Sequence, residues 1–562
     1  MTGRLRPWSA IDPWQHKTID VMCHADECLA LLETGFGKTL CAMTAGDELH
    51  QLGIVKRPLV LAPLRVAQNN WPQERFEWEH LKHIEMVEWG GEPADWDDSL
   101  WKQSRVLWGQ RTAAEGKLNN AEARVHTQIG RELDDRIAAA TNAGEDGQVA
   151  QHVLDFYRNK FALNPNQVRA AIDSVVTPLE ERIAMVTAEE RRVNKLIRKT
   201  EPPACWHVTS FENIEWLTDL YPPGTSPFDL WIVDETGRLA RNPKSPRYKA
   251  IKKHMPFAKI KWGLNATPAP EGLLDLFGQV QIVVGKRIWG TSFPLWRQKF
   301  FYPTDYNAYN WKPQRGAFEE IMDDLNGIAF RVPPEGLAYH KSIQHRQIEM
   351  DMPAKARAAY KEMEKQLAVD LENGTDIVAL SEASASIKLR QITQGYVYEV
   401  DGRGNRTVHI LHEEKLHALS DLIDSMAGEP LLVAYGFDQD LDNIRKVFKN
   451  VPYLGQGASA RDVSSHIERW NKREIPVLAL HPLSGSHGLN LQYGGHHIAW
   501  MCLPWGLDMY TQTNDRIDRR GQERQCYGHH LIMRDSMDQR VSDALIEKDA
   551  TQRSVIDAIR KL

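Results

Sequence analysis

The sequence lacks any long apolar run. A helix that crosses a membrane needs roughly 20 consecutive apolar residues, and no stretch of this chain approaches that length. The N-terminus has no apolar segment behind its first charged residues, Arg4 and Arg6, and so lacks the pattern of a secretory signal. We therefore expect no membrane partner and a cytoplasmic location.

Cysteine is also scarce. The chain has 6 cysteines among 562 residues, and no two of them are spaced as C-x2-C. Because structural zinc sites are commonly built from such pairs, a zinc site is not expected. Free, buried thiols in a reducing compartment are the simpler interpretation.

Neither sign of charge is in excess. The chain carries 69 basic and 75 acidic residues, for a net charge of -6. A small DNA-binding domain is usually basic overall, whereas a large protein can concentrate positive charge in one cleft. Net charge therefore argues neither for nor against a nucleic-acid partner.

Short apolar runs are present, and they fall into two groups. They have the character of buried parallel strands and lie at residues 29–32, 58–63, 230–233, 260–264, 430–435, 475–480 and 497–501. Since helical stretches separate them, we expect an α/β fold with a parallel, doubly wound sheet in each half. From the chain length, two to four domains are expected, because single cores stop growing at about 250–300 residues.

The predicted domains are a first lobe over residues 1–282, a connecting brace over 283–345 and a second lobe over 346–562. Residues from about 95 to 203 differ, because they are polar and carry apolar residues at helical spacing. They predict a helical insertion in the first lobe, interrupted at 141–147. Its basic end, 191–199, is either a solvated helix face or an arm that contacts phosphates.

The loop at 33–39 has the composition of a phosphate-binding loop. Gly35 and Gly37 allow backbone N–H groups to converge on oxygen. Lys38 supplies positive charge and Thr39 a hydroxyl for Mg²⁺, at the start of a predicted helix. The full G-x4-G-K-[ST] pattern would have glycine at position 32, where this chain has leucine.

Two adjacent carboxylates, Asp234 and Glu235, directly follow the apolar run at 230–233. Mg²⁺ prefers carboxylate oxygen, and hydrolysis requires a group that positions or deprotonates the attacking water. The pair can perform both tasks, although an Asp-Glu pair in a loop is commonly just solvated.

A third segment, residues 512–522, contains two arginines. Arg516 and Arg519 are three residues apart and are expected on one face of a helix. Arginines that reach phosphate oxygens stabilise the transition state of phosphoryl transfer. The alternative is a surface helix with salt bridges to Asp515 or Asp518.

Together and in this order, these segments resemble the Swi/Snf-type branch of helicase superfamily two. The segments at 5–15, 59–72, 207–212, 234–237 and 264–268 resemble its first-lobe motifs. The segments at 387–391, 484–492 and 512–522, with Lys415 and Trp505, resemble those of its second lobe. Gly237 and Asn265 depart from the usual D-E-A-H or D-E-G-H and L-T-G-T-P patterns.

The resemblance implies two RecA-like lobes that bind ATP and Mg²⁺ in the cleft between them. It assigns a catalytic role to Lys38, Asp234, Glu235, Arg516 and Arg519. It assigns ATP to Gln15, Thr34, Gly35, Phe36, Gly37, Lys38 and Thr39, with Gln15 reading adenine. It assigns the metal to Thr39 and Asp234, and DNA binding or lobe coupling to Arg65, Thr267, Gly488, Asn490 and Gln512.

The function expected from the resemblance is an ATP-dependent motor that translocates on or remodels double-stranded or branched DNA without reading its sequence. Compact members of this kind are typical of bacteria and phages. A catalytically weak DNA-binding clamp or scaffold and an RNA-directed helicase remain alternatives. The insertion at 95–203 is a candidate site for a protein partner.

Overall fold

The computed structural model describes residues 5–89, 100, 102–119, 165–198, 202–305, 308, 310–332, 343–372, 378–400, 406–485, 489–519 and 521–559. The chain forms two compact units. One comprises Met1–Trp89, Ala204–Glu215 and Phe228–Leu562, and the other comprises Gly90–Pro203 and Trp216–Pro227. None of the described helices is long and apolar enough to cross a membrane.

The first sheet of the larger unit has seven strands in the order β3-β4-β2-β5-β6-β1-β9, and all its pairings are parallel. The strands are β1 (Glu27–Leu31), β2 (Pro58–Ala62), β3 (Met86–Trp89), β4 (Trp206–Ser210), β5 (Leu230–Asp234), β6 (Ile260–Asn265) and β9 (Ala329–Arg331). Every residue of β2, β5 and β6 is buried. We call this sheet with the helices around it the first half of the molecule, and the second parallel sheet with its helices the second half. The apolar runs predicted as strands in the first half are confirmed.

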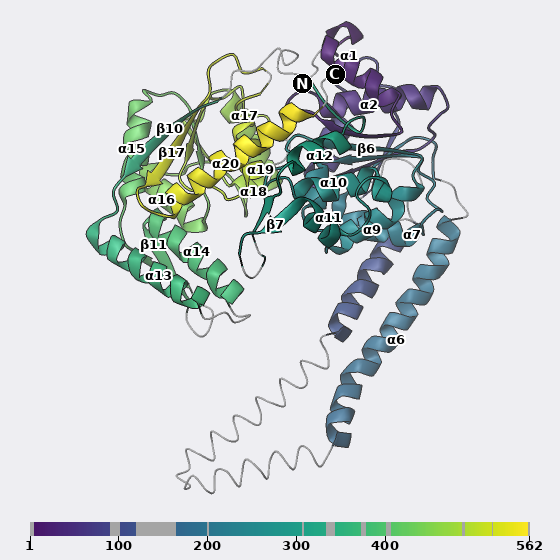
Figure 1. Cartoon of the computed structure of the whole chain (residues 1–562), viewed down its shortest axis with the longest axis horizontal. Coiled ribbons are helices and arrows are strands. Elements are labelled where there is room, and N and C mark those ends of the chain that lie inside the picture. The colour runs from purple at the N-terminus through teal and green to yellow at the C-terminus, as the bar shows by residue number, and fades with distance from the viewer. Residues whose placement is uncertain are drawn as a thin grey trace. The chain divides into compact units, whose positions relative to one another are not determined.

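Along the chain, helices connect these strands (Figure 1). They are α1 (Pro13–Cys23), α2 (Lys38–Gln51), α3 (Trp71–Glu74), α7 (Ile214–Leu220), α8 (Thr236–Ala240), α9 (Pro246–His254), α10 (Asp275–Val283), α11 (Phe293–Phe300) and α12 (Ala317–Asp324). The core of this half contains large side chains such as Trp71, Trp206 and Trp262 beside the aliphatic residues of β2 and β5.

The stretch expected as a connecting brace contributes to this sheet. Its last described strand, β9, pairs with β1. Before it, Trp289, Trp296 and Phe300 form an aromatic cluster with Phe277 of α10. β7 (Phe301–Pro303) and β8 (Trp311–Pro313) form a short antiparallel pair. The aromatic residues without a clear period therefore pack as a cluster around α10 and α11.

The second compact unit is helical where it is described, as the sequence predicts. It contains a helix over 102–119 and α6 (Pro165–Ile197). Arg111 joins the two, since its Nε donates to Glu190 Oε2 of α6 at 2.8 Å. Its Nη2 also lies 3.1 Å from Asp219 Oδ2 of α7. Ser104 donates to Asn194 Oδ1 at 2.6 Å. The interruption expected at 141–147 lies outside the described residues.

The second sheet has six strands in the order β10-β17-β16-β13-β15-β14, again with parallel pairing throughout. They are β10 (Gln344–Met350), β13 (Leu431–Ala434), β14 (Tyr453–Leu454), β15 (Val477–Leu480), β16 (His497–Trp500) and β17 (Tyr527–Met533). A separate antiparallel pair joins β11 (Tyr396–Val400) to β12 (Arg406–Ile410). Two parallel sheets, one in each half, confirm the predicted fold class.

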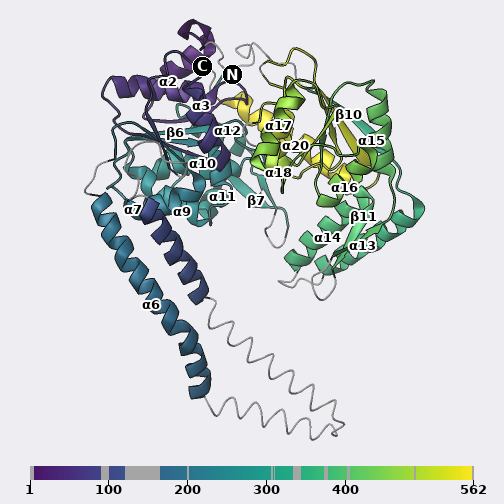
Figure 2. The ribbon, with the colours of Figure 1, turned by 180° about the vertical axis from the view of Figure 1, so that it is seen from behind.

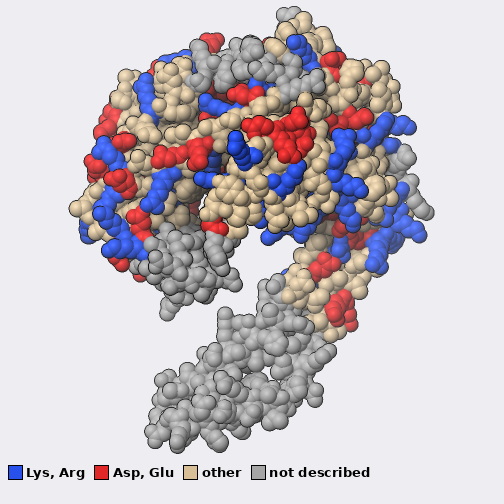
Figure 3. All heavy atoms as spheres, in the orientation of Figure 1, with Lys and Arg blue, Asp and Glu red and all other residues tan. Residues whose placement is uncertain are grey.

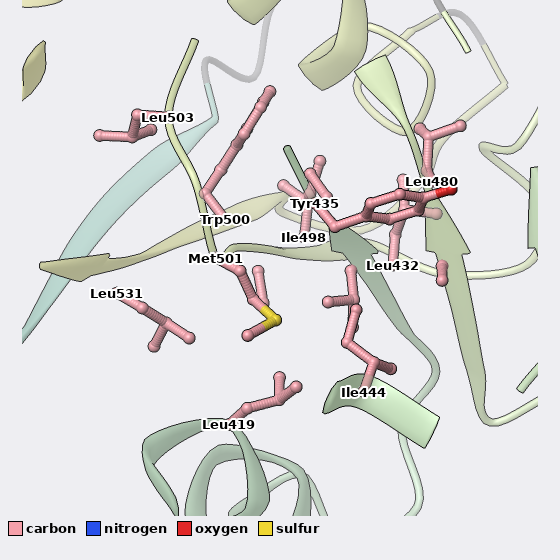
Figure 4. Close-up of a cluster of buried hydrophobic side chains, with 14 of the residues drawn as sticks. Leu419, Leu432, Tyr435, Ile444, Leu480, Ile498, Trp500, Met501, Leu503 and Leu531 are labelled. Carbon is pink, nitrogen blue, oxygen red and sulfur yellow. The ribbon is translucent and has the colours of Figure 1, made fainter. Parts of the chain in front are cut away.

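The helices of this half are α13 (Ala354–Glu372), α14 (Val378–Gln394), α15 (Glu414–Ser425), α16 (Asp438–Val447), α17 (Ala460–Asn471), α18 (Pro482–Gly485), α19 (Leu507–Asn514) and α20 (Met537–Ala558). Leu419 of α15 and Ile444 of α16 point toward the side chains of the sheet (Figure 4). α20 follows β17 and runs beside the sheet (Figure 2).

A buried ion pair ties three of these elements together. Lys415 Nζ of α15 lies 2.7 Å from Asp538 Oδ2 at the start of α20 and donates to the Met501 carbonyl at 2.7 Å. Asp538 also accepts from the Thr393 hydroxyl of α14 at 3.0 Å. The two charged side chains are 1% and 6% exposed, so removing either one leaves a buried charge without its partner.

We therefore predict that Lys415→Met destabilises the second half of the molecule by about 3–5 kcal/mol, the usual cost of breaking one side of a buried pair. The measurement is thermal unfolding followed by tryptophan fluorescence. Lys446→Met is the matched control, because the Lys446–Glu413 pair is almost half exposed and 2.9 Å long. Equal melting temperatures for the two variants would contradict the prediction.

Candidate functional site

The parallel first sheet gathers the predicted site residues at one edge. The carboxyl ends of neighbouring parallel strands meet at the same edge of a sheet. The loop at 33–39 follows β1, Arg65 follows β2, Asp234 ends β5 and Thr267 follows β6. Four segments that are far apart in the sequence therefore lie together.

The loop adopts the backbone that its glycines predict. Gly35 has φ +84° and Gly37 has φ +94°, both in the region that favours glycine. Gly37 is the N-cap of α2, which begins at Lys38. A Cβ at position 37 would lie 2.7 Å from Gln15 Nε2, so that position requires glycine on two counts.

Gln15 reaches this loop from α1. Its Nε2 donates to the Phe36 carbonyl at 2.5 Å, and its Oε1 accepts from the Asp12 backbone N–H at 3.0 Å. The second bond is part of the capping box that begins α1. Gln15 thereby joins the N-terminus of α1 to the loop.

Leu32, which replaces the expected glycine, is accommodated in the core. Its side chain is buried in the hydrophobic cluster of the first half. Its backbone N–H donates to the Asn265 carbonyl at 3.0 Å, and its own carbonyl accepts from Lys38 Nζ at 3.3 Å. The substitution therefore leaves Gly35, Gly37 and Lys38 in a phosphate-loop arrangement.

The two carboxylates lie beside the loop lysine. Lys38 Nζ is 3.9 Å from Glu235 Oε1. Asp234 Oδ2 accepts from Trp71 Nε1 at 2.9 Å, and Asp234 Oδ1 accepts from the Glu235 N–H at 3.0 Å. Glu235 has φ +54°, a left-handed conformation that is uncommon for a residue with a side chain.

The surroundings of Asp234 disfavour its ionised form. Burial raises the pKa of Asp234 to about 6, with a further contribution from the charge of Glu235. Lys38 and the Trp71 hydrogen bond act in the opposite direction. A carboxylate with a raised pKa beside a second carboxylate is an arrangement found at functional sites.

Two of the departures from the first-lobe motifs, Gly237 and Asn265, touch each other. A Cβ on Gly237 would lie 2.6 Å from Asn265 Nδ2. That amide donates to Gln279 Oε1 at 2.6 Å and to the Thr267 carbonyl at 3.2 Å. Glycine at 237 thus makes room for asparagine at 265, which holds the segment that carries Thr267.

The prediction of a single helix over residues 512–522 is wrong for the described residues after Asn514. α19 ends at Asn514, and Arg516 and Arg519 lie in the turns that follow. The physical reason is a competing hydrogen bond, because the Arg516 carbonyl accepts from the Leu491 N–H at 3.2 Å. The loop after α18 thereby interrupts the helical ladder.

Both arginines still converge, on a carbonyl of that loop. Arg516 Nη1 and Arg519 Nη1 each lie 3.4 Å from the Leu489 carbonyl oxygen. Burial lowers the pKa of Arg516 to about 10, assisted by the charge of Arg519, while Asp515 and Glu235 act in the opposite direction. The charge of Glu235 in the first half therefore acts on an arginine of the second half.

Asp515 is a site residue that the motif analysis did not assign. Asp515 lines the same cavity as Thr34 of the loop. Burial raises the pKa of Asp515 to about 7, and Thr34, Arg516 and Lys38 lower it. The motif at 512–522 contains Asp515, but nothing in that motif indicates that its carboxylate lies near the loop.

A cavity of about 1020 Å³ opens beside the loop. Its walls include Gln15, Thr34, Gly35, Phe36 and Thr267 from the first half and Asp515 and Arg519 from the second. It also reaches α20 and Arg331, which no motif signalled.

The remaining predicted residues are placed less centrally. Arg65 is exposed at the sheet edge, and Asn490 is exposed after α18, where its carbonyl accepts from Asn471 Nδ2 at 2.8 Å. Gln512 lies on α19, and its carbonyl accepts from Arg516 Nε at 3.0 Å. Gly488 lies outside the described residues.

Comparison with known proteins agrees with the motifs. The chain is 22% identical to the DNA repair and recombination protein RAD54-like of Gallus gallus, over 58% of this chain and 49% of that protein. It is 24% identical to the SWI/SNF-related matrix-associated actin-dependent regulator of chromatin subfamily A-like protein 1 of Xenopus laevis, over 57% of this chain and 32% of that protein. The chain is a distant relative of Swi/Snf-type proteins, as its motifs predict. It spans about half of the first of these relatives and about a third of the second.

A further similarity extends over the full length. The chain is 28% identical to the putative protein p41 of Acyrthosiphon pisum secondary endosymbiont phage 1, over 98% of each chain. The solved structure of the Sulfolobus solfataricus SWI2/SNF2 ATPase core in complex with dsDNA aligns over 98% of this chain and 97% of that chain, with 15% identity and a TM-score of 0.36. No family model matches the chain.

The contact between Gly237 and Asn265 generates a prediction in which the effect of one substitution changes sign. Alanine is favoured over glycine within a helix by about 1 kcal/mol, and Gly237 lies in α8. In the natural chain, Gly237→Ala should nevertheless destabilise by about 1–3 kcal/mol, because the new Cβ overlaps the Asn265 amide. In an Asn265→Ala background the same change should stabilise. Melting temperatures of the four proteins in the cycle provide the measurement, and additive effects would refute the contact.

Proposed function

We propose that this chain is an ATP-driven motor that moves on or remodels duplex or branched DNA. The observation that carries the proposal is the position of Glu235. Its carboxylate lies 3.9 Å from the loop lysine Lys38, and the cavity beside that loop is lined by Thr34 of the first half and by Asp515 and Arg519 of the second. An ATP site built in this way is complete only when both halves contribute to it.

The loop would hold the phosphates. The loop leads into the N-terminus of α2, the end of a helix that attracts anions. Its glycines have positive φ, which lets backbone N–H groups converge on a phosphate. The Lys38 ammonium would supply the fixed positive charge of this phosphate site. The residues proposed to surround the phosphates are Thr34, Gly35, Phe36, Gly37, Lys38 and Thr39. Gln15 would hold the loop in place through Phe36 and leave part of its amide for adenine.

The carboxylate arrangement fits Mg²⁺. Asp234 is 4% exposed, and with Glu235 it places two carboxyl groups near one lysine. A divalent cation held by Asp234 and the Thr39 hydroxyl would neutralise phosphate charge. The raised pKa of Asp234 is consistent with a carboxylate whose ionised form depends on a bound cation.

Glu235 would orient and deprotonate the attacking water. Its side chain is 21% exposed, so it is accessible to solvent while held near Lys38. Arg516 and Arg519 would stabilise the charge that develops on the transferred phosphoryl group, an effect of about 10³–10⁵ in rate for such arginines. Because they belong to the second half, lobe closure would be required for hydrolysis.

DNA is the proposed polymer because the named relatives include a DNA repair and recombination protein. Charges of both signs are spread over the face in Figure 3, so we expect local phosphate contacts rather than one basic surface. The residues proposed to bind DNA or to couple the lobes are Arg65, Thr267, Gly488, Asn490 and Gln512. The contacts should be independent of sequence and weakened by salt.

We propose that the motor acts in the cytoplasm of a bacterium or a phage-infected cell, and the similarity to p41 supports this proposal. A catalytically weak clamp and an RNA-directed helicase remain the competing functions. The helical insertion would offer a surface to a protein partner.

The direct test is phosphate release in the presence of duplex DNA, branched DNA or duplex RNA. We expect DNA to stimulate release and Lys38→Ala to reduce it by at least about 10²-fold, because the loop loses its fixed charge. Lys446→Ala is the control, since Lys446 pairs with Glu413 on the surface. Absence of release with every polymer would favour the clamp, and stimulation by RNA alone would favour the RNA-directed helicase.

A second test uses the pKa of Asp234. Trp71→Phe removes the hydrogen bond that favours the ionised carboxylate, so the folded-state pKa should rise further above its ordinary value. Because the ionised form is the metal ligand, the acidic limb of the ATPase pH profile should move upward by about one pH unit. Trp262→Phe, which loses a bond to the Ala25 carbonyl, should leave the limb in place. Identical profiles for the two variants would argue against the proposed role of Asp234.

A further inference from the structure

The cavity beside the loop has a second wall that the motor mechanism above does not use. Arg331 ends β9, and in the sheet register it lies opposite Leu31, the last residue of β1. Its side chain therefore starts one strand away from the beginning of the phosphate loop. Arg331 lines the same cavity as Thr34, Gly35 and Phe36.

Two buried polar atoms in this wall have no hydrogen-bond partner among the described residues. Arg331 is 2% exposed, and its Nε is unpartnered. Gln552 of α20 is 5% exposed, lines the same cavity and has an unpartnered Oε1. Buried polar groups are nearly always hydrogen-bonded, so these two residues of the cavity wall keep one unused donor and one unused acceptor.

The other Arg331 contacts fix the guanidinium in position. Its Nη2 lies 3.2 Å from Asp557 Oδ1 and 3.4 Å from the Asp557 carbonyl oxygen. Asp557 and Gln552 both belong to α20, which follows β17 of the second sheet. The wall is therefore built from one strand of the first half and one helix of the second.

Gln15, which lines the same cavity, is already engaged in the fold. Its Oε1 accepts from Asp12 and its Nε2 donates to Phe36. One N–H and one lone pair remain, so Gln15 alone offers a nucleoside few contacts. The unused groups at Arg331 and Gln552 lie in the same cavity, of about 1020 Å³.

We propose that Arg331 and Gln552 bind the nucleoside half of the nucleotide whose phosphates occupy the loop. A nucleoside presents both acceptors and donors on its base and ribose, which match the Arg331 Nε–H and the Gln552 carbonyl oxygen. This inference rests on the proposed function. It adds that α20 contacts the nucleotide directly, so nucleotide occupancy is sensed by the second half independently of Arg516 and Arg519.

The first experiment is photo-crosslinking with 2-azidoadenosine 5′-triphosphate, followed by peptide mapping of the full chain. The inference expects adducts within 329–332 or 545–557 that are lost in Lys38→Ala. Adducts confined to residues 8–16 would overturn it while leaving ATP binding intact. Crosslinking that unlabelled ATP does not compete, or that Lys38→Ala does not reduce, would refute the proposed function itself.

Affinity measurements on variants provide the second test. Gln552→Leu should weaken binding of a non-hydrolysable ATP analogue by at least about fivefold, the effect of one net hydrogen bond. Arg331→Lys, which keeps the charge near Asp557 but removes Nε–H, should act in the same direction. Gln539→Leu is the matched control, because Gln539 is an exposed glutamine in the first turn of the same helix. Equal affinities of the Gln552→Leu, Arg331→Lys and Gln539→Leu proteins would overturn the inference.

Discussion

The parallel pairing of β1 with β6 on one side and β9 on the other is the constraint on which the rest of the site depends. Five register pairs join β1 to β6, from Glu27–Lys261 to Leu31–Asn265. This pairing holds the start of the phosphate loop beside Asn265, whose carbonyl accepts from the Leu32 N–H at 3.0 Å. Because β5 pairs with β6 in turn, Asp234 and Glu235 emerge at the same edge. A change of register by one residue would reverse which face each side chain occupies and would separate the loop from its carboxylates.

Both halves of the molecule contribute charged groups to the site at that edge. One ammonium, Lys38, lies near Asp234, Glu235 and Asp515, and burial raises the pKa of both aspartates. Positive charge is supplied from the second half by Arg516, whose own pKa is lowered by burial. Where the two halves meet, charged groups of each are buried beside those of the other, and a buried charge without such a counterpart is costly in a low dielectric. The geometry therefore links the chemistry proposed for this site to the approach of the two sheets.

The departures from the family motifs acquire a physical explanation at the level of contacts. Leu32 is tolerated because its backbone, rather than its side chain, faces the loop. Gly237 and Asn265 are tolerated together, because the asparagine amide occupies the space that a larger residue at 237 would need. These are compensations between neighbours, and they weaken the argument that the departures indicate an inactive scaffold.

By itself the sequence determined the elements and the kinds of residue at the site. The apolar runs specified the strands, since a fully buried parallel strand must be apolar along its whole length, and glycine spacing specified the loop backbone. The sequence could not determine where the helix before Arg516 ends, because the hydrogen bond from Leu491 that interrupts it comes from a distant loop. Nor could it reveal Asp515 against Thr34, or Arg331 and Gln552 in one cavity, since no local pattern records which side chains meet across two sheets. Only tertiary structure decides such contacts, because they depend on strand order and on the approach of α20 rather than on spacing along the chain.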